Sequence, residues 1–253
     1  MMIEAFALSD IGRRRRINAD AALIDKDAGV VAVADGMGDL PRSAAIAQRA
    51  LDALRDVFSA PCDVFPVPWA RLPPAERWPT LAGELLMRGV AQANRSLYAP
   101  EHRQPLGTTL AAVVACCEHL CVAHAGDSRV YLLRASSGRL LRLTEDDTVL
   151  SRELARGMPL HQATTQPHAH ALTRVIGMGL EIPIRPYTLG WGPGDLVMAC
   201  TDGLTNSMSS ERIERLLHTC EGNLCAAARR LVSEANAADG RDNVTVVLAR
   251  RTV

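Results

Sequence analysis

The sequence contains no apolar stretch long enough to cross a membrane. Its longest apolar run, residues 110–117, is far shorter than the roughly 18 residues that suggest a membrane helix. In the first 16 residues the basic side chains follow a short mixed stretch, which is the reverse of a secretory signal. We therefore expect a soluble, cytoplasmic protein that is neither exported nor bound to a membrane.

The chain also lacks an excess of charge of either sign. Its 28 basic residues balance 28 acidic residues, so no global field attracts nucleic acid or anionic lipid. Lys26 is the only lysine, and every other basic residue is arginine. Binding must depend on local sites, and we expect no nucleic-acid partner.

Paired cysteine motifs are absent. The seven cysteines form no C-x-x-C pair, and their odd number suits reduced thiols in a cytoplasm. A zinc site on Cys117 and Cys121 is the alternative. The apolar residues that flank these two cysteines favour buried, unreactive thiols instead.

Hydrophobic patterning predicts a mixed α and β protein. At 253 residues and 48% hydrophobic, the chain can bury a large core, and we favour one domain over two. Apolar, β-prone runs predict strands at residues 30–35, 109–115, 120–125, 129–134, 196–200 and 244–249, with the second, third and fourth forming a meander. Helical spacing predicts helices at 43–58, 81–98, 144–156 (N-cap Thr144), 210–218 and 224–237. This order differs from the regular alternation of a doubly wound parallel sheet.

Proline blocks regular structure between the first two predicted helices. Residues 59–79 contain six prolines, which oppose both helix and ladder pairing, so this segment is a loop or a surface insert. Trp69 and Trp78 within it could form a partner-binding patch, but we favour the interpretation that they pin the loop onto the body. Residues 157–171, rich in Pro, Thr and His, predict irregular structure.

Four aspartates stand where an apolar strand gives way to a glycine or polar turn: Asp35, Asp127, Asp202 and Asp242. A carboxylate at a strand end is rigidly held yet open to solvent, which a hard-cation site requires. Adjacent glycines let the backbone come close, so the Gly36 carbonyl oxygen is a further candidate ligand. Oxygen ligands favour magnesium or manganese over zinc. Each aspartate alone is equally well explained as a turn residue, but four together weaken that explanation.

Seven short motifs follow one another along the chain. They are SDIG at 9–12 with Arg15, Asn18 and Asp20, then DGMG at 35–38, GTT at 107–109, GDSR at 126–129, LTR at 172–174, TDGL at 201–204 and DNVT at 242–245. In this order they resemble the metal-dependent protein phosphatases, also called protein phosphatase 2C, in their bacterial single-domain form. The resemblance implies one domain over residues 1–253. It also implies an α+β fold, a four-layer α-β-β-α sandwich of two antiparallel sheets flanked by helices, with a metal cleft at one end and a flap-like segment at about 144–180.

The resemblance also implies a two-metal site. Asp35 would bridge two Mn2+ or Mg2+ ions and the Gly36 carbonyl would bind one of them, while Asp202 and Asp242 would complete the other. A water molecule shared by two divalent cations loses a proton far below its usual pKa, and the resulting hydroxide would attack phosphorus in line. No covalent intermediate is needed. No cysteine begins a C-x5-R signature, which argues against the cysteine-dependent phosphatases.

Further residues surround these ligands in the family pattern. Asp20 would lie in the outer shell, and Asp127, with help from Asp202, would hold a third, weaker ion. Arg15 would bind and orient the substrate phosphate through its forked donors, a role that lysine would fill less well. We interpret the other arginines of the run at 13–16 as a solvated basic segment.

The sequence departs from the family pattern in the cleft. Ala19 stands where relatives usually carry an acidic residue, and Asp39 stands where a glycine is usual. We hypothesise that Asp39 is an outer-shell group that partly replaces the missing carboxylate; the alternative is an acidic residue that leads a helix. Met37 stands where some relatives carry a candidate general-acid histidine, so the leaving group would be protonated by water or another group. Arg241 replaces a small residue and would narrow the cleft.

The prediction is therefore a cytoplasmic, monomeric serine/threonine phosphoprotein phosphatase that opposes a bacterial serine/threonine kinase. Its partners would be phosphoserine and phosphothreonine proteins and the cognate kinase. Two other classes stay open: a catalytically weak phosphoprotein-binding or regulatory module on the same fold, and an interaction protein that works through the proline-rich segment. Three flap histidines could bind substrate or metal, although exposed loop histidines are commoner: His161, His168 and His170.

Overall fold

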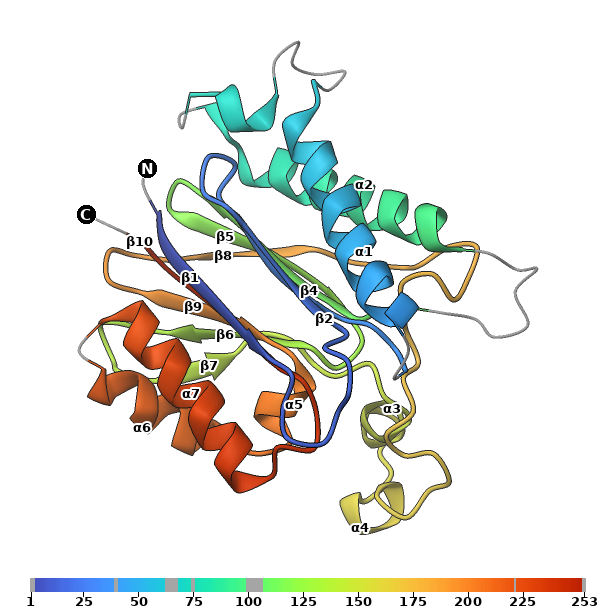
Figure 1. Cartoon of the computed structure of the whole chain (residues 1–253). Helices are drawn as coiled ribbons and strands as arrows, with labels where there is room; N and C mark the ends of the chain where they lie inside the picture. The colour runs from blue at the N-terminus through green and yellow to red at the C-terminus, as the bar shows by residue number, and fades with distance from the viewer. Residues whose placement is uncertain are drawn as a thin grey trace.

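Two antiparallel five-stranded sheets lie face to face at the centre of the protein (Figure 1). The computed structural model describes residues 3–38, 41–61, 68–73, 76–98, 107–220 and 222–251. The first sheet has the order β1 (Ile3–Asp10), β10 (Val244–Arg251), β9 (Leu196–Cys200), β6 (Arg129–Leu133) and β7 (Leu140–Arg142). The second has the order β2 (Asp20–Asp25), β3 (Val30–Asp35), β4 (Leu110–Cys116), β5 (His119–Ala125) and β8 (Tyr187–Gly190).

Helices cover the outer face of each sheet. The helices α1 (Pro41–Ser59) and α2 (Pro79–Leu97) share a buried cluster with the second sheet. On the other side, α6 (Ser210–Thr219) and α7 (Leu224–Ala238) pack on the first sheet, next to the short α5 (Asp202–Thr205). A third cluster fills the space between the sheets. The predicted four-layer α-β-β-α sandwich is therefore confirmed.

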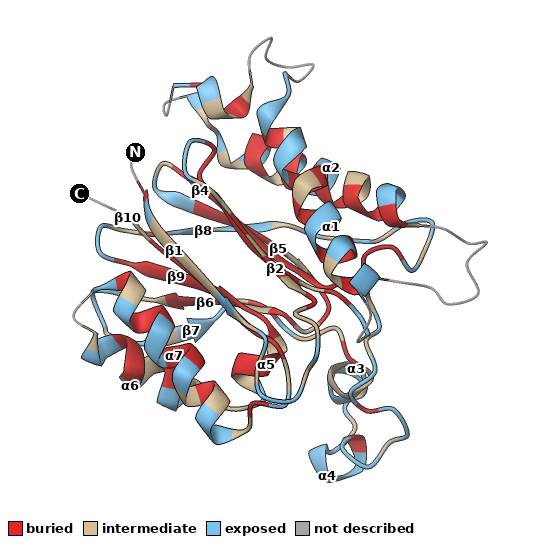
Figure 2. Ribbon diagram, viewed as in Figure 1, coloured by how far each residue is buried: buried red, intermediate tan, exposed pale blue. Residues whose placement is uncertain are grey.

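Burial explains why the apolar runs became central strands. Every residue of β4 and β9 is buried, because each of these strands has one face on the other sheet and one on helices. Figure 2 shows this buried material concentrated on the strands and on the inner sides of the helices. No helix among the described residues is long and apolar enough to span a membrane.

The predicted meander of three strands is wrong in its last step. β4 and β5 pair with each other, but β6 lies in the other sheet between β9 and β7. The chain changes sheet at Gly126, whose φ of +93° favours glycine and where a Cβ atom would lie 2.7 Å from Thr109 Cγ2. Alternation along one strand identifies the strand but not its neighbours, so the sequence could not show this crossing.

The helix predicted from Thr144 begins later than expected. It is α3 (Val149–Ala155), and its N-cap is Thr148, whose hydroxyl accepts a hydrogen bond from Ser151 N at 3.1 Å. Thr144 is instead buried, and its hydroxyl accepts a hydrogen bond from Val130 N of β6 at 3.0 Å. This hydroxyl is therefore not available to cap a helix. A second short helix, α4 (Leu160–Ala163), lies in the stretch predicted to be irregular.

The proline-rich segment contains one short element, η1 (Trp69–Arg71). Trp69 is only 2% exposed, its indole N–H donates to Ala28 O at 2.8 Å, and its ring meets Phe58 edge to face at 6.2 Å. Arg77 lies over the same ring, 5.7 Å from its centroid. Trp69 therefore pins the segment to the body, whereas Trp78 is 53% exposed.

Candidate metal centre

Five aspartates from both sheets converge at one end of the sandwich. In the second sheet, Asp20 begins β2 directly opposite Asp35 at the end of β3, and Asp127 follows β5. In the first sheet, Asp202 follows β9 and Asp242 precedes β10. A cavity of about 220 Å3, which we call the cleft, opens among them. It is lined by Asp35, Asp127, Asp202, Asp242, Arg15, Ala19, Gly36, Met37, Gly38, Thr109, Leu172 and Asn243.

Backbone contacts fix Asp35 and Gly36 at the floor of the cleft. The Asp35 amide donates to the Thr109 hydroxyl at 3.0 Å, and its carbonyl accepts from the Thr108 hydroxyl at 2.8 Å. A Cβ atom at position 36 would lie 2.2 Å from Ser43 O, so only glycine fits this strand end. The Gly36 amide donates to Ala19 O at 3.1 Å.

Asn243 ties Asp242 to the loop that carries Arg15. Its side-chain oxygen accepts from Ala19 N at 2.8 Å, and its amide donates to the carbonyls of Ile11 and Ile17 at 2.9 and 3.0 Å. The DNVT motif contains this residue, but no local pattern indicates its separate role. Arg15 then reaches Asp242 Oδ2 at 2.8 Å, so the arginine lies at the edge of the cleft.

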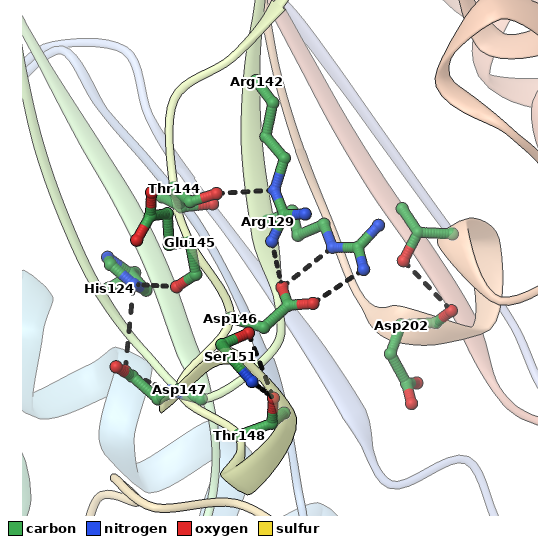
Figure 3. Close-up of polar contacts among 12 residues, drawn as sticks. His124, Arg129, Arg142, Thr144, Glu145, Asp146, Asp147, Thr148, Ser151 and Asp202 are labelled. Atoms are coloured by element: carbon green, nitrogen blue, oxygen red, sulfur yellow. Dashed lines mark hydrogen bonds and ion pairs between the residues drawn. The ribbon is translucent and has the colours of Figure 1, made fainter. Parts of the chain in front are cut away.

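Two buried carboxylate oxygens have no hydrogen-bond partner. Asp20 accepts from the hydroxyls of Thr201 and Thr245 through Oδ2 alone, and its Oδ1 is unpartnered. Asp202 accepts from Asn206 at 3.0 Å through Oδ2, and its Oδ1 is also unpartnered (Figure 3). Because a buried unpaired polar atom is costly, these oxygens indicate a missing electrophile such as a cation.

Burial and mutual repulsion make the ionised form of the carboxylates in the cleft unfavourable. Burial raises the pKa of Asp20 and of Asp202 to about 7, and that of Asp127 to about 6. It also raises the pKa of Asp35 well above its usual value, with further increases from the charges of Asp20, Asp202 and Asp242. A divalent cation would relieve both the repulsion and the unpaired oxygens, so these residues fit a metal centre.

The arrangement suits an ion that keeps bound water. Among the described residues, no three His, Cys, Asp or Glu side chains gather closely enough to hold an ion by themselves, so water would have to supply further ligands. Magnesium and similar hard ions take one or two carboxylates and retain several waters, so an open carboxylate cleft suits them. The same observation leaves the alternative zinc site on Cys117 and Cys121 without a third ligand of these types in the described ranges.

Asp147 fastens the base of the flap segment (residues 144–180) to the cleft. Its Oδ2 accepts from Gly126 N at 3.0 Å, and its amide donates to Gly126 O at 2.9 Å, immediately before Asp127. His124 Nε2 lies 3.8 Å from its Oδ2 (Figure 3). Arg174 lies 3.4 Å from Asp147 Oδ1. The sequence pattern predicts Asp147 in the first turn of a helix. Its anchoring role is not visible there, because these contacts join segments that are distant in the sequence.

The other residues singled out from the sequence have different outcomes. Asp39 falls outside the described residues. Met37 lines the cleft. Arg241 does not line it; it pairs with Asp239 at 2.5 Å and lines a neighbouring cavity together with His170. His161 and His168 are exposed on the flap segment.

Comparison with known proteins identifies the family. The family profile described as protein phosphatase 2C matches residues 13–235, and the chain belongs to this family. It is similar to the "Serine/threonine phosphatase stp" of Listeria welshimeri, with 28% identity over 97% of this chain and 94% of the relative. The predicted family and enzyme class are thereby confirmed.

Solved structures support the same fold. A PPM Ser-Thr phosphatase, MsPP from Mycobacterium smegmatis in complex with cacodylate, matches with a TM-score of 0.77 and 31% identity, covering 98% of each chain. The catalytic domain of PstP in complex with two manganese ions matches with a TM-score of 0.77 and 27% identity, covering 100% of this chain and 99% of that one.

Proposed function

We propose that the cleft binds two Mn2+ or Mg2+ ions and hydrolyses phosphoserine and phosphothreonine in proteins. The observation that carries this proposal is the convergence of Asp35, Asp202 and Asp242 from two sheets on one cavity, with a buried, unpaired oxygen on Asp202. The serine/threonine phosphatases among the relatives and the two manganese ions of PstP support it.

Each residue has a distinct role in this proposal. Asp35 and the Gly36 carbonyl would hold the ions on the floor of the cleft, and Asp202 and Asp242 would hold them from the side of the first sheet. When bound, two such ions activate a water molecule as the nucleophile and neutralise charge on the phosphoryl oxygens. The chain itself supplies a rigid floor, because Thr109 and its neighbours hold the backbone of Asp35.

The remaining charged groups position substrate and ions. Arg15, which stands at the edge of the cleft against Asp242, binds two phosphoryl oxygens through its guanidinium. Asp20 orients the outer shell through Thr201 and Thr245, and Asp127 holds a third, weaker ion. Met37 offers no proton, so the leaving alkoxide would take its proton from water or another group.

We further propose a monomeric, cytoplasmic enzyme of one domain that acts against a cognate serine/threonine kinase. The balanced charge of the chain supports recognition of substrates by local contacts at the cleft. The alternative, a phosphoprotein-binding module without catalysis, requires loss of metal binding. The retained carboxylates oppose that alternative.

One assay tests the catalytic proposal. Purified protein with Mn2+ should hydrolyse both an aryl phosphate and a phosphothreonine peptide, and Asp242→Asn should lower kcat by more than about 100-fold, because it removes a ligand. Asp52→Asn, on the outer face of α1, is the control and should leave kcat unchanged. Absence of hydrolysis together with absence of Mn2+ binding in calorimetry would favour the binding module.

A further inference from the structure

A second cavity lies beside the cleft and shares Asp242 with it. Its volume is about 350 Å3, and its lining comes from three separate parts of the chain: His170 of the flap segment, Asn206 and Ser207 after α5, and Asp239, Arg241 and Asp242 before β10. Because Asp242 lines both cavities, the second cavity adjoins the place where the substrate phosphate would bind.

The floor and one wall of this cavity are rigid. The Asn206 side chain donates to Asp202 Oδ2 at 3.0 Å, and the Ser207 hydroxyl donates to Gly203 O at 2.8 Å. A Cβ atom at position 203 would lie 2.0 Å from Asn243 O. The short helix α5 is therefore packed directly against the start of β10. The cavity is thus part of the same framework as the cleft.

Arg241 supplies an available cationic group at the rim. Its side chain is 70% exposed, and its Nε donates to Asp239 Oδ1 at 2.5 Å. A guanidinium has five N–H donors. Among the described residues, the Arg241 guanidinium donates only to Asp239. Because exposed ion pairs contribute only about 0–1 kcal/mol, Asp239 leaves Arg241 able to accept a second anion.

Charged groups of both signs surround Arg241, because Asp239 and Asp242 line the same cavity and the arginine run at 13–16 adjoins its loop. The Arg13 amide donates to Gly240 O, and its Nε donates to Asn236 O, both at 2.8 Å, which holds the arginine run at 13–16 against the loop of Arg241. The sequence predicts a solvated basic segment here, and Arg14 and Arg16 are exposed in the structure. Through the two hydrogen bonds of Arg13, the run brings positive charge next to the loop of Arg241, which partly offsets the negative charge of Asp239 and Asp242.

We propose that this second cavity is a specificity subsite, in which Arg241 binds an anionic side chain next to the phosphoresidue being hydrolysed. The anion is a carboxylate or a second phosphate on the substrate protein. Both suit the forked donors of arginine, and His170 and Asn206 supply further polar contacts in the same cavity. The proposal rests on the proposed phosphatase function of the cleft.

Peptide kinetics can test the subsite directly. Phosphothreonine peptides with glutamate, a second phosphothreonine, alanine or lysine at the flanking positions are compared by kcat/KM. Wild type should favour glutamate over lysine by about 10-fold, and the difference should lie in KM because Arg241 does not contact the reacting atoms. Arg241→Glu should reverse this order. Comparing glutamate with phosphothreonine shows which anion the subsite favours.

The ratio between two peptides cancels any change in the common catalytic step. Arg212→Glu is the matched control, since Arg212 is an exposed, ion-paired arginine on α6 that lines neither cavity, and it should leave the ratio unchanged. A wild-type enzyme without preference, or an Arg241→Glu variant that retains it, would overturn the subsite while aryl phosphate hydrolysis persists. Failure of wild type on aryl phosphate would instead overturn the catalytic proposal on which the subsite rests.

Discussion

Single carboxylates in the cleft are held in an unfavourable state when no cation is present. Burial and then the charge of Asp127 raise the pKa of Asp202 from its usual value near 3.8 to about 7. A folded-state pKa above the unfolded value means that the folded protein binds the proton more tightly. The contribution of Asp202 to the stability of the metal-free protein should therefore fall as the pH rises from about 4 through about 7.

Asp202→Asn should remove part of this pH dependence. In the presence of a chelator at pH 8, the variant should be more stable than wild type by at least about 1 kcal/mol, because it carries no buried charge. The difference should shrink toward zero below the unfolded-state pKa of about 3.8, where the carboxyl becomes protonated in both states. Urea unfolding at pH 8 and below this pKa measures it, with Asp52→Asn on the surface of α1 as control. Equal pH profiles for Asp202→Asn and wild type would contradict the prediction.

Among the larger elements, the flap segment depends on one anchoring carboxylate. Asp147 is 12% exposed and receives a hydrogen bond from Gly126 N, while its carbonyl accepts from Thr173 N at 2.7 Å, so both ends of the flap segment meet at this residue. Removing the side chain leaves the Gly126 amide unsatisfied and Arg174 without this partner. Such losses cost about 1–3 kcal/mol for each buried group.

Asp147→Ala should therefore loosen the flap segment before the rest of the fold. Hydrogen exchange of the amides at 149–176 should become faster, while the amides of β4 and β9 remain protected, because local opening needs less energy than global unfolding. Glu145→Ala, two residues earlier and exposed, is the control and should exchange like wild type. Unchanged exchange in the flap segment of Asp147→Ala would show that the carboxylate is not its anchor.

The proline-rich segment should respond very differently at its two tryptophans. Trp69→Ala removes a buried ring and its hydrogen bond to Ala28 O, and should lower the free energy of unfolding by about 3–5 kcal/mol. Trp78→Ala, at a half-exposed position, should change it by less than about 0.5 kcal/mol. Urea titration compares the two variants. Similar losses at both positions would contradict the pinning role of Trp69.

Elements were predictable from sequence where the information is local. Apolar spacing located α1, α2, α6 and α7, because one buried face imposes a helical period. It missed β1, β2, β7 and β8, of which β7 and β8 are largely exposed at sheet edges, and it could not place β6 in the other sheet. The aspartates at strand ends were recognisable, whereas Asn243 and Asp147 act through contacts with distant segments that no local pattern encodes.

For the molecule as a whole, the cleft is where the two sheets are joined chemically. Asp35 and Asp127 come from the second sheet, and Asp202 and Asp242 flank strands of the first. Asp20 of β2 in the second sheet already links the two sheets, because its carboxylate accepts hydrogen bonds from Thr245 of β10 and from Thr201 directly after β9 of the first sheet. Ions held by these carboxylates would couple the stability of both sheets.

Metal binding should therefore stabilise the entire fold in one cooperative transition. Free Mn2+ at 100 times its Kd adds about 2.7 kcal/mol to the free energy of unfolding, if the ion does not bind the unfolded chain. For a chain of this size, that corresponds to a rise in Tm of roughly 5–10 °C relative to the protein in chelator. Asp35→Asn should show a much smaller rise, since it removes a proposed metal ligand. Calorimetry that resolved two transitions, with only one moving on addition of Mn2+, would contradict both the coupling of the sheets and the single-domain organisation.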